Sequence, residues 1–432
     1  MIQQLFLNRE VADIMSSIKK RILFVTILFM ALALYGCTGG NSVSDNTAKV
    51  DESVIENMAM PVDTSGIEVT EEMLDAGIFN PGDTGRLASV MARAASGEDI
   101  TIAYIGGSIT NGDSANPKET KCYAYLTTEW WKETFPGANI NYVNAGIGAT
   151  DSYIGVHRAK RDVLAYKPDL VVVEFSVNDT RNHNKETYES LLRMLLNSDS
   201  QPAVISLIIT TEQGYDYASD HIQSAFNYKV PIISYKAEIE KGYEQKVISW
   251  DDIGSNDGVH PSNGGHAVIA NLLTTFYSDV LKDINNNEYT EEYVMADAKT
   301  KCRYENADII FADEMDITEN DGFVYENVWA NLSDTNGWVC TDGGSITFKA
   351  TGKSLGIIYQ KTTDGMSGVY DVYVDGEYCM QIDGDFKNGW GNCVDYVILG
   401  SYDESSEHTV SVMLNDNSEN KKMTICAVCV AE

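Results

Sequence analysis

The sequence predicts a two-domain protein, in which an α/β domain with a parallel sheet precedes an all-β sandwich. Between about residues 86 and 280, short apolar runs typical of buried strands alternate with helix-like segments. After about residue 290 the apolar runs become short and alternating, and Gly- and Asp-containing turns separate them. A length of 432 residues also suits two domains better than one.

The α/β pattern opens with a helix over residues 85–98, "GRLASVMARAASGE", which closes on a glycine. A second helix is predicted over residues 123–135, where it stops at Pro136-Gly137. Five strands are predicted from apolar runs: residues 100–107, 140–146, 170–177, 203–210 and 231–235. Alternating strands and helices favour a parallel sheet covered on both faces, with reactive groups beyond the carboxyl ends of its strands.

The C-terminal pattern is that of a sandwich, for which we expect a jelly-roll-like arrangement. Its strand signals include "GSITFKATG", "LGIIYQK", "GVYDVYVDGEY", "DYVILG" and "HTVSVML". Aromatic residues are frequent here, and we expect them mainly to fill the sandwich core, although exposed rings could stack on sugars. The predicted domains are residues 73–288 and residues 289–432.

The first 36 residues are predicted to be a targeting signal rather than part of the fold. Lys19-Lys20-Arg21 precedes "ILFVTILFMALALYG", an apolar run too short for a comfortable membrane span. The run ends at Gly36 before Cys37, which is typical of a bacterial lipoprotein signal in which Cys37 carries the lipid; an ordinary secretory signal is the alternative. We therefore expect an exported protein lipid-anchored at the bacterial cell surface, with a flexible tether over residues 37–72.

Charge and cysteine content exclude some classes of function. The formal net charge of −33 would repel phosphate backbones, so we expect no nucleic-acid partner. Seven of the eight cysteines follow Cys37, and an odd number spread over a long chain is no disulfide scaffold. Cys426 and Cys429 form a CxxC inside an alternating apolar end, which favours a strand over a metal or redox site.

Two serines near residue 110 compete for the role of nucleophile. Ser108 directly follows the predicted strand and two glycines, so it would emerge at the strand's carboxyl end in a tight turn. Backbone N–H groups of a helix starting there would face negative charge that develops beside the hydroxyl. Ser114 lies farther on, in the loop-like "NGDSANP". The topology favours Ser108.

A serine hydroxyl needs a base to take its proton. Among six histidines, His260 has the most telling context, "SNDGVHPSNGGHA", because Asp257 lies three residues before it. A turn there would bring the carboxylate to the imidazole and fix its tautomer. His266 is the rival base, but it lacks an acid three residues upstream.

Donors for an oxyanion are also present at predicted strand ends. They are backbone N–H groups around Gly148 and Ala149, the N–H of Ser108, and the side-chain amide of Asn178. The same glycines offer two weaker patterns. The GxxxxG spacing of residues 107–112 is followed by Asp113 where a phosphate-binding loop needs Lys, and Asp151 stands where a dinucleotide fingerprint needs its third glycine.

In this order, the pieces resemble the SGNH (GDSL-type) hydrolase family over about residues 95–275. The GDSxT block reads Gly106-Gly107-Ser108-Ile109-Thr110, with Gly107 in place of Asp, a variant found among carbohydrate-esterase-like branches. The second block resembles residues 144–149, with Ala149 where the family has its oxyanion glycine. The GxND block reads Ser176-Val177-Asn178-Asp179, and the DxxH block matches fully at Asp257 and His260.

The resemblance implies a flavodoxin-like three-layer α/β/α fold and ester hydrolysis through an acyl-serine intermediate, without any cofactor or metal. Catalytic Ser108, His260 and Asp257 are carried over from the family's motifs. With the export signal and the appended sandwich, this suggests removal of O-acetyl groups from an extracellular acetylated carbohydrate. The alternatives are a lipase-like or peptidoglycan O-acetyl esterase, and a non-catalytic glycan-binding lipoprotein.

Overall fold

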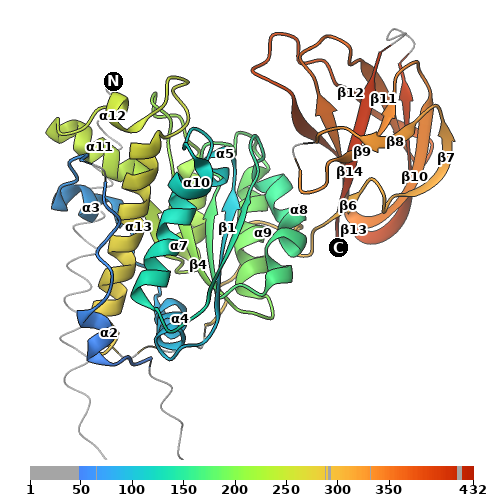
Figure 1. Cartoon of the computed structure of the whole chain (residues 1–432). Coiled ribbons are helices and arrows are strands. Elements are labelled where there is room, and N and C mark those ends of the chain that lie inside the picture. The colour runs from blue at the N-terminus through green and yellow to red at the C-terminus, as the bar shows by residue number, and fades with distance from the viewer. Residues whose placement is uncertain (1–47, 65, 288, 290–292, 331, 416–420) are drawn as a thin grey trace, which may run out of the picture. The chain divides into compact units, whose positions relative to one another are not determined.

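A five-stranded parallel sheet forms the centre of the first domain (Figure 1). Its strand order, β2-β1-β3-β4-β5, is the flavodoxin-like order that the family resemblance implied. The strands are β1 (Ile100–Gly106), β2 (Ile140–Gly146), β3 (Leu170–Glu174), β4 (Ala203–Ile208) and β5 (Ile232–Ser234). The register pairs Gly106 at the end of β1 with Gly146 on β2 and Glu174 on β3, so the carboxyl ends of three strands lie at one edge.

The computed structural model describes residues 48–432 except 65, 288, 290–292, 331 and 416–420. The signal segment, Cys37 and the first part of the expected tether therefore lie outside the described residues. Within the described part of the chain, none of the helices combines the length and the apolar character that crossing a membrane requires.

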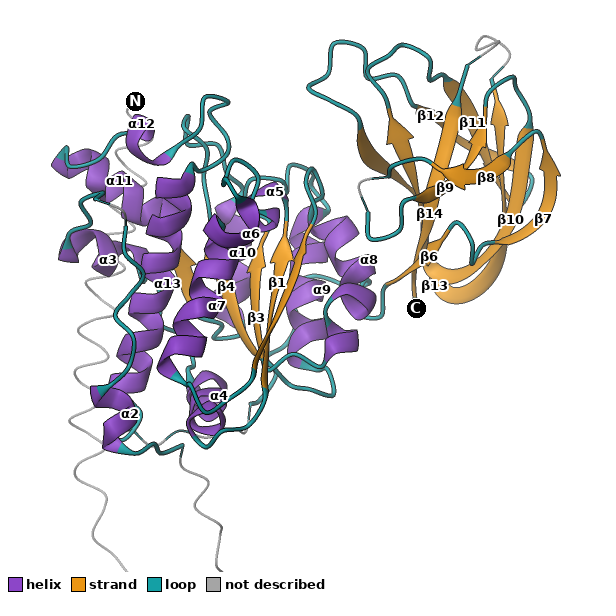
Figure 2. Ribbon diagram, in the orientation of Figure 1, coloured by secondary structure: helices purple, strands orange, loops and turns teal. Residues whose placement is uncertain are grey.

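Helices cover both faces of the sheet (Figure 2). On one face α4, α7, α11 and α13 pack against β-strand side chains such as Ile102 and Tyr104, and on the other α8, α9 and α10 pack against Ala103 and Ile105. Successive side chains of β1 thus pack into the cores on opposite faces of the sheet, as expected for a strand that is buried on both faces. The helices of this domain are α2 (Glu52–Glu56), α3 (Glu71–Gly77), α4 (Gly85–Ala95), α5 (Ser108–Asn111), α6 (Lys118–Lys121), α7 (Tyr123–Thr134), α8 (Ser152–Asp162), η1 (Leu164–Tyr166), α9 (Asn184–Leu196), α10 (Ala218–Asn227), α11 (Tyr235–Gln245), α12 (Trp250–Ile253) and α13 (Asn263–Asp283).

The structure corrects the expected tether over residues 48–64 and 66–72, because these residues pack on the first domain. The Trp130 indole donates a hydrogen bond to the Ala59 carbonyl at 3.0 Å, and Val62 N–H donates to Thr274 Oγ1 at 3.0 Å. Val50, Val54 and other apolar side chains of this segment lie against the core that contains α7 and α13. The sequence did not predict this contact. The apolar residues of the segment are widely spaced among polar ones and show neither helix nor strand periodicity.

The C-terminal domain is an antiparallel β-sandwich, as the sequence predicted. Strands β10 (Ser345–Lys361) and β13 (Cys393–Leu414) pair along most of their length, and register shifts at residues 352–356 mark β-bulges that bend strands. The two halves of β10 therefore pair with different partners, β7 and β14, on its other side. The remaining strands are β6 (Asp308–Phe311), β7 (Asp316–Asp321), β8 (Val324–Asn327), β9 (Asn336–Cys340), β11 (Val369–Val374), β12 (Glu377–Asp383) and β14 (Met423–Ala431).

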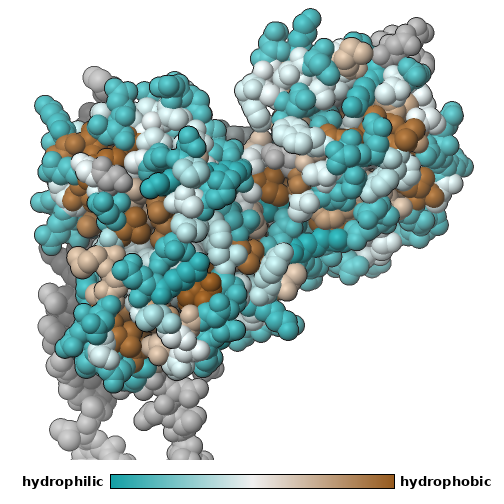
Figure 3. Space-filling model, viewed as in Figure 1, coloured by the Kyte–Doolittle hydropathy of each residue, from teal (hydrophilic) through white to brown (hydrophobic). Residues whose placement is uncertain are grey.

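The aromatic residues of the sandwich divide between its core and its surface. Tyr359 and Tyr370 are buried among apolar side chains, as we expected for most of these rings. Trp329 and Trp390 are 64% and 71% exposed. On the face of the molecule in Figure 3, hydrophilic residues predominate and apolar groups form small separate patches, in keeping with the high net charge.

The chain passes from the last helix to the first sandwich strand between Asp283 and Asp308. The second half of this connection is held on the first domain: the Tyr293 hydroxyl donates to the Tyr228 carbonyl at 2.8 Å, and Lys299 N–H donates to Glu189 Oε1 at 2.7 Å. The domain boundary at residue 289 stays a prediction within this connection.

Candidate active site

Ser108 begins the four-residue helix α5 immediately after β1 and Gly107. Asn111 N–H donates to the Gly107 carbonyl at 3.0 Å, which closes the turn, and Gly112 ends it at φ +90°. The end of β2 lies directly against α5, because a Cβ on Gly146 would come within 2.2 Å of the Asn111 nitrogen. The sequence thus places a serine on a tight, backbone-packed turn at the carboxyl edge of the sheet.

His260 lies next to Ser108 in the structure, although 152 positions separate the two residues in the sequence. Its Nε2 lies 2.8 Å from Ser108 Oγ, and its Nδ1 lies 2.7 Å from Asp257 Oδ2. With Nδ1 protonated and donating to the carboxylate, Nε2 is the acceptor for the Ser108 hydroxyl and could take its proton. The three side chains that the sequence singled out therefore form one continuous hydrogen-bonded row.

The DxxH spacing works through a small closed loop. Ser255 N–H donates to the His260 carbonyl at 2.8 Å, and Gly258 adopts φ +72° within the turn. Asp257 Oδ1 accepts from the N–H groups of Val259 and His260 at 2.8 and 2.9 Å. The carboxylate thus binds the backbone with one oxygen and the imidazole with the other. Despite the opposing effect of desolvation, hydrogen bonds from the His260 ring and backbone hold the pKa of Asp257 well below its usual value.

The rival candidates lie outside this row. Ser114 is an exposed loop residue with φ +68°. His266 is buried at the start of α13, where Nδ1 accepts a hydrogen bond from Tyr123 N–H at 3.3 Å. Burial lowers the pKa of His266 to about 4. Its contacts give it a structural role at the beginning of α7.

Asn178 is a candidate oxyanion donor whose side chain lies beside the turn that carries Ser108. A Cβ on Gly107 would be 2.6 Å from its Oδ1, so the amide occupies the space beside residue 107. Ala149 adopts the left-handed conformation, φ +60°, which glycine adopts without steric cost. The Ala149 backbone therefore adopts the left-handed conformation despite its Cβ. Asn144 Nδ2 donates to the Thr110 carbonyl at 2.8 Å and so ties β2 to α5.

Glu174, which sequence reasoning did not single out, lies beneath the turn at the end of β3. It is fully buried, and its Oε2 accepts a hydrogen bond from Thr110 Oγ1 at 3.0 Å. Burial raises the pKa of Glu174 to about 7. A charged residue inside the apolar run "LVVVEFSV" was the available signal, since such a residue needs a buried partner.

A second Ser–His–Asp row occurs in the sandwich. His408 Nδ1 lies 2.7 Å from Asp375 Oδ2, and its Nε2 lies 2.9 Å from Ser406 Oγ. Ser406 lies within β13, paired with Gly352 on β10, and not on a strand-to-helix turn. The distances match those at Ser108 while the backbone setting differs, which makes Ser406 a natural control.

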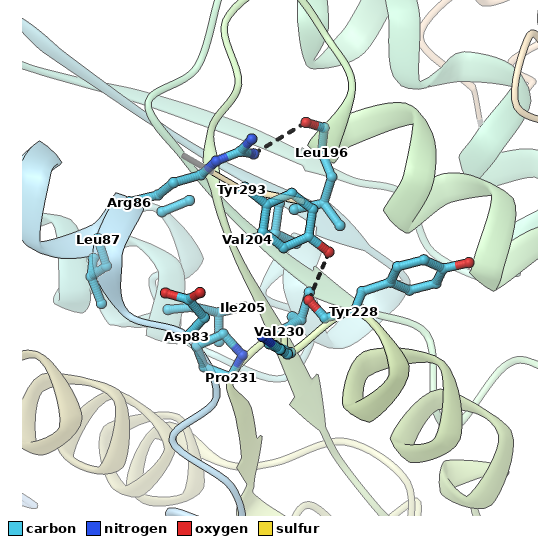
Figure 4. Close-up of a pocket in the computed structure, with 12 residues that line it drawn as sticks. Asp83, Arg86, Leu87, Leu196, Val204, Ile205, Tyr228, Val230, Pro231 and Tyr293 are labelled. Atoms are coloured by element: carbon cyan, nitrogen blue, oxygen red, sulfur yellow. Dashed lines mark hydrogen bonds between the residues drawn. The ribbon is translucent and has the colours of Figure 1, made fainter. Parts of the chain in front are cut away.

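A small cavity, drawn in Figure 4, is lined by residues that include Arg86, Tyr228 and Tyr293. Its lining also includes Ala203, the first residue of β4, and so the cavity lies at the edge of the sheet opposite to the carboxyl ends of the strands. Arg86 Nη1 donates to the Leu196 carbonyl at 3.1 Å. None of its lining residues belongs to the Ser108 row. Cys426 and Cys429 are buried within β14, which confirms the strand prediction.

Comparison with known proteins assigns the chain to a family. The model of the GDSL-like lipase/acylhydrolase family matches residues 104–268. A two-domain esterase active on acetylated mannans is 32% identical in sequence, and the match covers 83% of this chain and 98% of that one with a TM-score of 0.75. The chain belongs to the GDSL-like lipase/acylhydrolase family. The crystal structure of the same two-domain esterase with mannopentaose gives a TM-score of 0.74.

This family membership places the chain among the carboxylic ester hydrolases. An acetylxylan esterase of Xylanibacter ruminicola is 24% identical over 284 residues, which cover 51% of this chain. The match spans 57% of that relative's length. The likeness to the two-domain esterase extends over both the parallel-sheet domain and the sandwich, since it covers 98% of that chain.

Proposed function

We propose that this chain removes O-acetyl groups from an extracellular polysaccharide or oligosaccharide through an acyl-serine intermediate. The observation that carries the proposal is the hydrogen-bonded row Ser108–His260–Asp257 at the carboxyl edge of the sheet. An intact row of this kind favours an enzyme over a glycan-binding protein without activity.

In the first step, Ser108 Oγ attacks the acetyl carbonyl while His260 Nε2 takes the hydroxyl proton. The oxyanion of the tetrahedral intermediate accepts hydrogen bonds from the N–H of Ser108, backbone N–H groups at Gly148 and Ala149, and the Asn178 amide. When the intermediate collapses, the bond to the sugar oxygen breaks and His260 returns the proton to that oxygen. The sugar hydroxyl leaves, and acetyl-Ser108 remains.

In the second step, His260 takes a proton from water, and the hydroxide oxygen attacks the acetyl-serine carbonyl. Collapse of this intermediate releases acetate and restores the Ser108 hydroxyl with the proton held by His260. Asp257 stabilises the imidazolium in both steps through Nδ1.

The carbohydrate assignment is supported by the relatives and by the sandwich surface. The two similar proteins are described as active on acetylated mannans and as an acetylxylan esterase. The exposed rings of Trp329 and Trp390 offer flat apolar faces of the kind that stack on sugars. An acetylated β-linked polysaccharide of the mannan or xylan type is the substrate class that these observations favour.

Acetate release from acetylated mannan, acetylated xylan and their oligosaccharides tests the proposal. We expect release from at least one of these glycans by the wild-type protein and none by Ser108→Ala. Hydrolysis confined to long-chain acyl esters, or to O-acetylated peptidoglycan, would overturn the assignment.

Export and anchoring belong to the same proposal. They rest on the basic residues, the apolar run and Cys37 in the sequence. Labelling of cells with a fatty-acid analogue should mark the wild-type protein and not Cys37→Ala. A protein that is released into the medium without any lipid would contradict the anchor.

A further inference from the structure

Tyr396 of the sandwich packs against the first domain. It contacts Asp151, which lies two residues after the candidate oxyanion donor Ala149. It lies on β13, is 4% exposed, and stacks on the Tyr153 ring at 4.1 Å between centroids. Its hydroxyl donates to Asp151 Oδ2 at 2.5 Å, and His183 Nε2 lies 2.6 Å from the same hydroxyl. The single phenolic proton goes to the carboxylate, so His183 supplies the second hydrogen bond as a donor.

Asp151 is the N-cap of α8 and lies two residues after Ala149. Its Oδ1 accepts from the N–H groups of Tyr153 and Ile154 at 3.1 and 3.3 Å. Its Oδ2 accepts from Asn184 Nδ2 at 3.0 Å as well as from Tyr396. The carboxylate is therefore saturated with donors, and the loop that carries Gly148 and Ala149 is fixed at its far end.

Asp179 joins the second oxyanion segment to the same helix. It directly follows Asn178, and its Oδ1 accepts from Ser152 N–H, the first residue of α8, at 2.7 Å. Its Oδ2 lies 2.7 Å from His221 Nε2. The start of α8 thus links the loop after β2 to the loop after β3, and the two carboxylates are buried at 8% and 2% exposure.

Two buried carboxylates at one helix start are costly unless donors surround them. Tyr396 is the donor from the other domain. Without its hydroxyl, Asp151 would keep Asn184 and the helix N–H groups, but its Oδ2 would lose its shortest hydrogen bond. The loss would loosen the helix start from which both oxyanion segments are held.

We infer that Tyr396 is a positioning residue for ester hydrolysis, which holds the oxyanion loops in place through Asp151 at the start of α8. The sandwich would then be part of the catalytic apparatus as well as a surface for substrate. This inference rests on the proposed acyl-serine route through Ser108, but it is independent of which sugar carries the acetyl group.

The test uses p-nitrophenyl acetate, whose hydrolysis does not depend on glycan binding. For Tyr396→Phe we expect kcat to fall about tenfold with KM within about twofold, because the hydroxyl acts on the transition state through the oxyanion donors. Tyr304→Phe is the matched control, since Tyr304 packs edge-on against Tyr153 in the same junction and does not contact Asp151. Its kcat should stay within about twofold of wild type.

A double-mutant cycle between Tyr396→Phe and Asp151→Asn shows whether Tyr396 acts on kcat by positioning Asp151 or only by holding the two domains together. If Tyr396 acts through Asp151, the double variant should have nearly the kcat of the more impaired single variant. His183→Leu, which removes the second partner of the Tyr396 hydroxyl, should lower kcat several-fold and keeps the test open if Tyr396→Phe does not fold. Unchanged kcat in these variants, an equal loss in Tyr304→Phe, or multiplying losses in the cycle would overturn the inference. Absence of Ser108-dependent activity in the wild type would instead overturn the proposed function.

Discussion

The side chain of Asn178 occupies the space that any side chain at residue 107 would need. An ideal Cβ on Gly107 lies 2.6 Å from Asn178 Oδ1 and 3.2 Å from its Cγ. The backbone of Gly107, with φ −87° and ψ −149°, does not itself require glycine. Glycine is therefore needed at residue 107 because the Asn178 side chain fills the space that a Cβ would occupy. This allows the Asn178 amide to lie beside the turn that carries Ser108.

Gly107→Ala should accordingly impair catalysis more than folding. The new methyl would push the end of the Asn178 side chain away, and loss of one oxyanion donor typically costs about 10²–10³ in kcat. Thermal unfolding should change little, because a flexible side-chain end can move. Gly137→Ala is the matched control, since a Cβ there meets nothing within 4 Å. A fully active Gly107→Ala variant would contradict the role of Asn178 as an oxyanion donor.

Ser108→Ala should lower kcat by at least about 10⁴-fold and leave the unfolding temperature within a few degrees of wild type. The hydroxyl is the nucleophile in the proposed mechanism, and its removal leaves the turn intact. Ser114→Ala and Ser406→Ala serve as controls, the second because Ser406 is also hydrogen-bonded to a His–Asp pair, His408 and Asp375, in another backbone setting. Loss of activity in either control, with Ser108→Ala active, would identify a different nucleophile.

Asp257→Asn should lower kcat about 10–100-fold less than Ser108→Ala does. Asparagine can keep the acceptor for the Val259 and His260 N–H groups, but its amide donor disfavours the imidazole tautomer that accepts from Ser108. The Asp257 side chain is 47% exposed, so water can partly stabilise the imidazolium in its place. Steady-state kinetics on an aryl acetate will measure the loss. A variant as inactive as Ser108→Ala would contradict this partial dependence on Asp257.

Glu174→Gln should change how stability depends on pH. The carboxyl pKa rises from 4.5 to about 7 on folding, so between these values the folded state holds a proton that the unfolded state has released. The wild-type free energy of unfolding therefore falls as pH rises through this window, by about 3 kcal/mol from this group. Glutamine does not titrate, so the stability of the variant relative to wild type should increase over the same range.

Urea unfolding of both proteins at several pH values between about 4.5 and 7.5 measures this difference. Contributions from other titrating groups, such as Asp151, cancel when the two proteins are compared. A difference that is flat or falls with pH would show that Glu174 is ionised in the folded state.

The α/β domain could be predicted from the sequence because each buried strand is a short apolar run between turn residues. The Ser108–His260–Asp257 row was also predictable, since Ser108 follows a strand directly and Asp257 lies within one turn of His260. Their proximity in space could only be inferred from the resemblance to a known family. The structure brings Ser108 Oγ and His260 Nε2 to 2.8 Å.

What the sequence did not reveal depends on contacts between distant segments. Residues 48–64 and 66–72 pack on the first domain through scattered apolar side chains that show no periodicity. Tyr396 and Asp151 are separated by 245 positions, and Tyr396 looks like an ordinary alternating residue of a strand. Neither pattern nor propensity marks a tyrosine that donates to a buried carboxylate in another domain.

Labelling with a fluorophosphonate, followed by peptide mapping, identifies the nucleophilic serine, because the reagent reacts with a serine whose proton is taken by a neighbouring base. We expect one adduct on Ser108 in the wild-type protein, abolished in Ser108→Ala and strongly slowed in His260→Ala, with Ser114 and Ser406 unmodified. An adduct on Ser114 or Ser406, or a wild-type protein that stays unlabelled while folded, would contradict the role of Ser108 as the nucleophile.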